Sequence, residues 1–337
     1  MTRVTTPLET SLTRLLGIQV PIVQAPIGGC ATPELTAAVI NAGGLGMLAT
    51  SWTPPGEIEG LIERTRKLAA GPLGVNLVLE WEQHERLVAC LEAGVEVVSF
   101  FWGDPEPYLP ILKAAEVKTM LTVGSAAEAK RAVEQGIDVV VAQGLEAGGP
   151  VWGKVATIAL VPAVVDAVDG RAPVVAAGGI ADGRGLAAAL MLGASGVGLG
   201  TRFVASRESA AHPGYQGAIV GAPETDTLLT ELFDGGWPEA PHRVLSNSTT
   251  RAWQAAGSPP RGHRPGEGGL LGRRPSGEDV HRYAAEAPLA GMTGDWEAFA
   301  LYAGQSAGLV RDVQPAGEII RRMVADARSV MARWPTS

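Results

Sequence analysis

The hydrophobic positions of this sequence fall into eight short apolar runs within its first 211 residues. These runs are rich in Val and show little polar alternation, which is typical of parallel strands that are covered on both faces. The predicted strands span residues 21–26, 44–50, 73–79, 95–101, 117–123, 137–143, 173–179 and 195–201.

Amphipathic stretches with helical spacing separate these runs. Several of them end in Gly, as helices often do. The predicted helices span residues 33–43, 55–70, 82–94, 106–115, 125–136, 156–168 and 182–193. Eight alternating units predict an α/β fold of the (β/α)8 TIM barrel type, with a doubly wound open sheet as the alternative.

The alternating pattern stops after residue 211. Residues 212–290 are rich in Pro, Gly, Arg and polar residues and predict an inserted lobe, α-rich or loop-rich, with its most irregular part at 257–277. An amphipathic helix at 315–334 follows. We therefore expect a barrel over 1–211, the smaller lobe over 212–290, and a C-terminal segment over 291–337 whose helix completes the barrel.

The composition narrows the class of protein. It is 46% hydrophobic with a formal net charge of -8, which suits a globular protein and speaks against nucleic-acid binding. Cys30 and Cys90 have no metal or redox spacing, and no apolar run has the length of a signal peptide or membrane span. We expect a cytoplasmic protein without metal or membrane partner; the oligomeric state stays open.

Two glycine-rich turns predict a phosphate site. In a TIM barrel, phosphates favour the loops after strands 7 and 8. Gly178 and Gly179 follow the seventh predicted strand, while Gly200 and Thr201 follow the eighth. Their backbone N–H groups and one hydroxyl can face a dianion. Few basic residues lie nearby, so one phosphate monoester, as in a mononucleotide cofactor, is expected.

Four tryptophans, Trp52, Trp81, Trp102 and Trp152, each stand just after a predicted strand. In a barrel they would gather at the rim of the catalytic face and form an apolar pocket for a ring system or a hydrophobic substrate. Simple packing of scattered loops is the alternative.

Two further side chains could handle polar chemistry. Histidine is the usual general base, and His242 lies in the predicted lobe, where it could face the mouth of the barrel. Glu146 lies in the loop "GLEAGG", where we expect it to bond backbone N–H groups and fix the turn.

Six motifs together resemble the nitronate monooxygenase family, formerly called 2-nitropropane dioxygenases. The resemblance runs from about residue 12 to about residue 330 and implies an FMN-binding TIM barrel with a smaller inserted domain. The motifs are "VPIVQAPIGG" (20–29), "GVNL" (74–77), "AQGLEAGG" (142–149), "AAGGIADGRG" (176–185), "GLGTRF" (198–203) and "LYAGQSAGLV" (301–310).

The resemblance also implies which residues meet the cofactor. The flavin ring would lie against Ala25, Pro26 and Ile27, and the phosphate would lie on the two glycine-rich turns. The other implied contacts are Asn76, Thr122, Gln143, Gly149 and Ala177, with Tyr302 and Gln305 closing the site. Asn76 and Gln143 are amides at strand ends, which can offer donors and acceptors to the polar edge of a flavin.

The sequence departs from the family at one position. Members usually carry "EAGGH", and that histidine is taken as the base that removes the α-proton of a nitroalkane. Here the loop reads "EAGGP", so Pro150 stands in its place. His242 or Tyr302 could take over proton transfer. The expected substrate pocket is formed by Trp52, Trp102, Pro150 and Trp152.

The resulting hypothesis is an FMN-dependent oxidoreductase that oxidises an alkyl nitronate, or a similar stabilised carbanion, with O2. An ionised substrate needs no base. The alternatives are an NAD(P)H-dependent flavin reductase of quinones or enoyl thioesters, and an FMN-binding homologue without catalysis.

Overall fold

The computed structural model describes residues 8–333. Residues 1–7 and 334–337 lie outside the described residues. These residues include the start of the predicted barrel segment and the end of the predicted C-terminal segment. Trp334, at the end of the last predicted helix, is one of them.

Eight parallel strands form a nearly closed barrel, which confirms the predicted fold class. The ring order is β1-β9-β8-β6-β5-β4-β3-β2, and a parallel bridge between Val23 and Leu45 brings its two edges together. The strands are β1 (Ile22–Gln24), β2 (Gly46–Ala49), β3 (Leu73–Val78), β4 (Val97–Phe101), β5 (Lys118–Val123), β6 (Val139–Gln143), β8 (Val174–Ala177) and β9 (Gly196–Leu199).

Alternate strand residues face two different apolar layers. Val97, Met120 and Val175 belong to an inner cluster, which also contains Leu12 of helix α1 (Ser11–Leu16). Their neighbours in the strands, such as Val98 and Leu121, pack in the larger cluster shared with the surrounding helices. Strands covered on both sides explain why the sequence shows continuous apolar runs instead of alternation.

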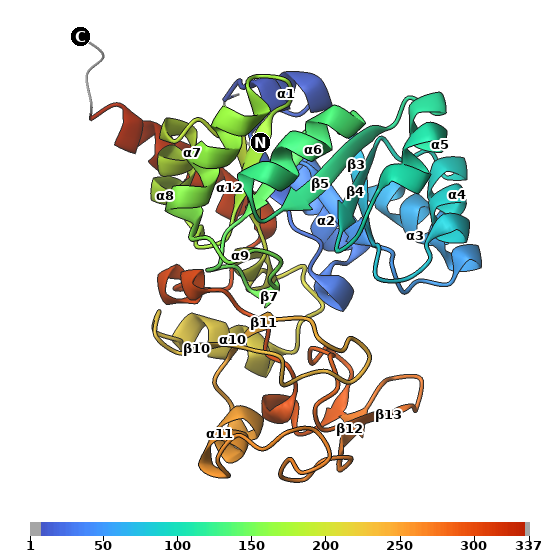
Figure 1. Cartoon of the computed structure of the whole chain (residues 1–337), viewed down its shortest axis with the longest axis vertical. Helices are drawn as coiled ribbons and strands as arrows, with labels where there is room; N and C mark the ends of the chain where they lie inside the picture. Colours follow the sequence, from blue (N-terminus) through green and yellow to red (C-terminus); the bar gives the residue numbers. More distant parts are fainter. Residues whose placement is uncertain (1–7, 334–337) are drawn as a thin grey trace.

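Helices connect successive strands and surround the barrel (Figure 1). Their ends follow local signals: Ser125 caps the start of α6 (Ala126–Gln135) through the Glu128 N–H, and Gly136 ends it with a left-handed backbone. Helix α12 (Ala316–Met331) packs against α8 (Gly183–Met191) and α2 (Pro33–Asn41). The other helices of this layer are α3 (Pro55–Leu68), α4 (His84–Glu92), α5 (Leu109–Ala114) and α7 (Thr157–Val168).

Most of the chain between the short helix α9 (Thr201–Val204) and α12 lies beyond one end of the barrel (Figure 1). It contains α10 (Pro213–Gly221), α11 (Ser248–Ala255) and two small antiparallel sheets that the sequence did not predict. One sheet joins β10 (Thr227–Thr230), β11 (His242–Leu245) and β7 (Gly149–Pro150); the other joins β13 (Asp279–His281), β12 (Leu270–Arg273) and β14 (Thr293–Gly294). The domain boundaries at residues 211 and 290 stay predictions.

Candidate functional site

The predicted site residues lie where barrel strands end or in the loops that follow. Asn76 lies near the end of β3, Thr122 near the end of β5 and Gln143 at the end of β6. Ala177 ends β8, directly before Gly178 and Gly179, and Ala25–Ile27 follow β1. Because the strands are parallel, these positions share one face of the barrel.

The two glycine-rich turns stand side by side, since β8 and β9 are hydrogen-bonded neighbours. Gly178 and Gly179 have φ angles of +99° and +73°, the left-handed region that favours glycine. Gly200 precedes the first turn of α9, which has no side-chain cap. The structure thus brings bare backbone N–H groups of two adjacent turns to one place, as an anion site requires.

Glu146 fixes the loop after β6, which confirms its expected structural role. Its carboxylate accepts hydrogen bonds from the Thr157 N–H at 2.9 Å and the Thr157 hydroxyl at 2.9 Å, at the start of α7. Its carbonyl accepts from the N–H of Gln305 at 3.0 Å. The C-terminal segment comes so close that a Cβ at Gly148 would lie 2.3 Å from the Gly304 nitrogen.

The side-chain amide of Gln143 holds the next part of this loop. Its Nε2 donates to the Pro150 carbonyl at 3.1 Å, and its Oε1 accepts from the Trp152 N–H at 2.8 Å. The Trp152 indole donates to Glu128 at 2.9 Å. Each end of the Gln143 amide therefore makes one hydrogen bond to the loop, which leaves one N–H and one lone pair. Its predicted contact with a flavin ring stays a prediction.

Asn76 is the more available amide. The residue is 3% exposed, and its side-chain Nδ2 donates to the Ser99 carbonyl at 3.1 Å. Among residues 8–333, no group donates a hydrogen bond to its Oδ1. A buried amide oxygen with spare acceptor capacity can receive a ligand N–H.

Pro150 lies opposite His242, one of the two candidate proton carriers, and His242 in turn lies next to the other, Tyr302. In the β7–β11 pairing, Pro150 is opposite His242, and the His242 ring lies 5.7 Å from the Tyr302 ring in an edge-on arrangement. His242 is buried, with Nδ1 2.8 Å from the Ala240 carbonyl and Nε2 accepting from the Phe233 N–H at 3.2 Å. Both nitrogens are engaged by backbone, so the imidazole has no free lone pair for a substrate proton.

Burial lowers the pKa of His242 from 6.5 to about 4, although the bond to Ala240 opposes the shift. Between these values the unfolded chain binds more protons at this site than the folded chain, so stability falls as the pH is lowered. We expect a loss on the order of 3 kcal/mol between pH 7 and pH 4 in urea unfolding. The His242→Gln variant should not show this loss of stability. Equal pH dependence of the unfolding free energy in both proteins would contradict its assignment to His242.

Tyr302 is placed differently. Burial raises the pKa of its phenol well above the ordinary value, so the hydroxyl stays protonated at neutral pH. Within the described chain this hydroxyl makes no hydrogen bond, whereas the Tyr302 carbonyl accepts one from Tyr215. Tyr302 can therefore donate a hydrogen bond to a ligand but is a poor base. The catalytic roles predicted for His242 and Tyr302 remain predictions.

The four predicted tryptophans do gather, and a fifth joins them. Trp52 and Trp81 have ring centroids 5.6 Å apart, and Trp102 and Trp152 are 4.9 Å apart. Trp237, from the segment between β10 and β11, joins the two pairs at 5.2 Å from both Trp81 and Trp102. The clustering is thus confirmed, while the role of these rings as a substrate pocket stays a prediction. No local signal in the sequence marks Trp237 as a member of this cluster.

Two cavities flank Trp152. The larger, about 800 Å³, lies between the loop at 145–154 and the segment 229–264; the smaller, about 250 Å³, includes Thr122 and Trp102. Of the residues predicted to hold FMN, only Thr122 lines either cavity. The larger cavity therefore adjoins the predicted cofactor site and does not coincide with it.

Residues 8–333 contain neither a group of metal ligands nor a membrane-spanning helix. No three His, Cys, Asp or Glu side chains are grouped so that they could hold a metal ion. No helix in this part of the chain is long and apolar enough to cross a membrane.

Comparison with known proteins shows relatives over nearly the whole chain. The model of a family described as nitronate monooxygenase matches residues 9–326. The chain is 40% identical over 252 residues (74% of this chain, 69% of the relative) to a (3aS,4S,5R,7aS)-5-hydroxy-7a-methyl-1-oxo-octahydro-1H-indene-4-carboxyl-CoA dehydrogenase of Rhodococcus jostii. It is 35% identical to a nitronate monooxygenase of Pseudomonas aeruginosa, with 94% of this chain and 98% of that protein covered.

The fold of this chain is also similar to that of a solved structure. The structure of FabK from Thermotoga maritima has a TM-score of 0.80 and 32% identity, with 97% of this chain and 98% of that chain covered.

Proposed function

Since the chain belongs to the nitronate monooxygenase family and is an oxidoreductase, we propose that it binds FMN and oxidises an alkyl nitronate, or a similar stabilised carbanion, with O2. The observation that carries this proposal is the lack of a usable imidazole beside the loop after β6. Pro150 has no side-chain proton carrier, and the facing His242 has both ring nitrogens engaged by backbone. A substrate that arrives already ionised needs no base at either position.

The residues present fit FMN best at its phosphate end. Gly178 and Gly179 donate no hydrogen bond within residues 8–333, so their N–H groups are available to an anion. The Thr201 oxygen accepts from the Gly304 N–H at 2.9 Å, which leaves its hydroxyl proton free to donate. Ala25 and Ile27 lie next to Gly200, within 3.8 Å of where its Cβ would stand, and form an apolar wall beside this site.

The other residues would orient the ring and exclude water. FMN, when bound, would accept electrons from the substrate and deliver them to O2. Asn76 would offer its free Oδ1 to a ring N–H, and the protonated Tyr302 hydroxyl would donate to an oxyanion. Trp102 and Trp152 would cover the substrate with apolar surface.

Anaerobic reduction of the bound flavin tests this proposal. We expect ethylnitronate to bleach the flavin and neutral nitroethane to do so far more slowly, because removing the α-proton requires a base. Stopped-flow absorbance at a fixed pH would compare the two rates. Equal rates for both forms would contradict the proposed dependence on an ionised substrate.

A second candidate function has its own support. A cavity of about 800 Å³ next to the site is far larger than a small nitronate requires. It would suit NAD(P)H-dependent reduction of a quinone or an enoyl thioester, and the relatives include a CoA-thioester dehydrogenase and FabK. Anaerobic bleaching of the flavin by NADH or NADPH would support this candidate. Failure of both donors would exclude it.

A further inference from the structure

The larger cavity has two walls of different origin. The loop after β6 supplies Leu145, Val151, Trp152 and Lys154. The facing wall comes from the segment 229–264 and includes Leu229, Trp253 and Arg261. Leu229 and Trp152 are 40% and 37% exposed, so apolar side chains are left open toward solvent here. A concave, largely apolar space of this size suits a ligand larger than a few atoms.

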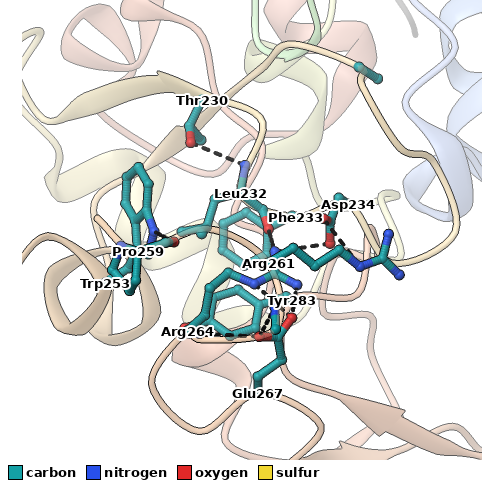
Figure 2. A network of polar contacts seen from close by, with 12 residues as sticks. Thr230, Leu232, Phe233, Asp234, Trp253, Pro259, Arg261, Arg264, Glu267 and Tyr283 are labelled. Atoms are coloured by element: carbon teal, nitrogen blue, oxygen red, sulfur yellow. Dashed lines mark hydrogen bonds and ion pairs between the residues drawn. The ribbon is translucent and has the colours of Figure 1, made fainter. Parts of the chain in front are cut away.

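A saturated polar network stiffens the second wall (Figure 2). The Arg264 guanidinium donates to the Leu232 carbonyl and to Asp234, each at 3.0 Å, and forms a close ion pair with Glu267. It also lies 4.2 Å from the centre of the Tyr283 ring. Arg264 therefore has its partners within the fold and is not available to a ligand.

Two other cations on the cavity walls are held less firmly than Arg264. Lys154 makes no ion pair or hydrogen bond within the described part of the chain. The Arg261 Nε lies 3.9 Å from Asp234, at the limit of an ion pair, and its side chain is 69% exposed. Asp234 is already paired with Arg264, which leaves Glu231 as the one unpaired carboxylate lining this cavity. Because Arg264 is shared by Asp234 and Glu267, the charges around this cavity balance, but each wall still presents an exposed cation.

Each wall also presents an indole ring. Trp152 is held by bonds to Gln143 and Glu128, and Trp253 donates from its Nε1 to the Pro259 carbonyl at 2.9 Å. Fixed aromatic faces favour flat rings, because little conformational entropy is lost when a ring stacks on them. Fixed indoles beside exposed cations match a ligand that joins a flat ring to phosphates.

We propose that this cavity binds the adenosine phosphate moiety of the substrate or hydride donor, with Lys154 and Arg261 on its phosphates and Trp152 or Trp253 on its adenine. Acyl-CoA thioesters and NAD(P)H both contain an adenosine phosphate moiety. The inference rests on the second candidate function, reduction of a thioester or quinone, and assigns that reaction a nucleotide subsite beside the flavin.

Calorimetric titration of the full-length protein with coenzyme A, with NADP⁺ and with adenosine tests the subsite without any turnover. We expect the double variant Lys154→Gln, Arg261→Gln to bind the phosphate-bearing ligand about tenfold more weakly, because two partly exposed cation–phosphate contacts are lost. Higher salt should weaken binding to the wild type more than to the variant. Adenosine, which has no phosphate, should bind equally to both.

The matched control is Lys113→Gln, Arg64→Gln, which makes the same charge change on exposed positions of α5 and α3. It should bind like the wild type. Binding of coenzyme A alone would identify a thioester as the source, and binding of NADP⁺ alone would identify the hydride donor. No binding of either ligand, or equal weakening in both double variants, would overturn the subsite. Flavin reduction by NADH or NADPH is measured separately, so failure of the second candidate function is distinguishable from failure of the subsite.

Discussion

Replacing Pro150 with histidine is expected to raise turnover of neutral nitroalkanes by about 10²- to 10⁴-fold, the usual contribution of a positioned general base. The Pro150 carbonyl already accepts a hydrogen bond from Gln143, and a histidine backbone can keep that bond. Position 150 is half-buried, on the loop that adjoins both cavities. Anaerobic flavin reduction by nitroethane would measure the gain.

His242 is not able to supply the base that a histidine at position 150 would supply. It lies directly opposite Pro150, yet its nitrogens are engaged by Phe233 and Ala240. A histidine at position 150 would stand beside His242 on the same face of the strand pair. Because Phe233 and Ala240 already bond the His242 ring, we expect the new imidazole to keep a free nitrogen. Burial also lowers the pKa of His242 to about 4, which makes it a weak base at neutral pH.

Pro150→Ala is the control for this experiment. It removes the ring restraint on the backbone without adding a proton carrier. We expect its nitroalkane rate to stay at the wild-type level and ethylnitronate rates to be similar in all three proteins. An equal gain in the alanine and histidine variants would attribute the effect to loop mobility. No gain in the histidine variant would mean that position 150 does not reach the substrate.

The barrel could be predicted from the sequence because its signals are local. Continuous apolar runs, glycine caps and repeated strand and helix units each lie within a few residues of the element they define. The tryptophans after strands 2, 3, 4 and 6 could be placed for the same reason. Once the strands are parallel, their ends share one face.

The parts that were not predicted depend on contacts between distant segments. Strand β7 is two residues long and exists only because Gly149 and Pro150 pair with Arg243 and His242. Trp237 follows no barrel strand, and only the folded chain shows that it joins the tryptophan cluster. The hydrogen bonds between the Gln143 amide and its own loop could not be predicted for the same reason. Single-sequence patterns carry no information on such pairings.

Substituting Gly178 with alanine is expected to lower the affinity for FMN by at least about tenfold. The φ of +99° is unfavourable for alanine by about 1–2 kcal/mol, and the new Cβ would lie 2.9 Å from the Gly144 carbonyl oxygen. Relief of that contact would move the turn whose N–H groups are proposed to face the phosphate. Flavin fluorescence during titration of the apoprotein with FMN would give the dissociation constants.

Gly136→Ala separates this local effect from general strain. Gly136 also has a left-handed backbone, with φ of +90°, but its Cβ would meet nothing within 4 Å, and it ends helix α6 outside the predicted site. We expect this control to lower the free energy of unfolding by about 1 kcal/mol and to leave FMN affinity unchanged. If Gly178→Ala keeps the wild-type affinity, or if both variants lose FMN equally, the turn after β8 is not the phosphate site.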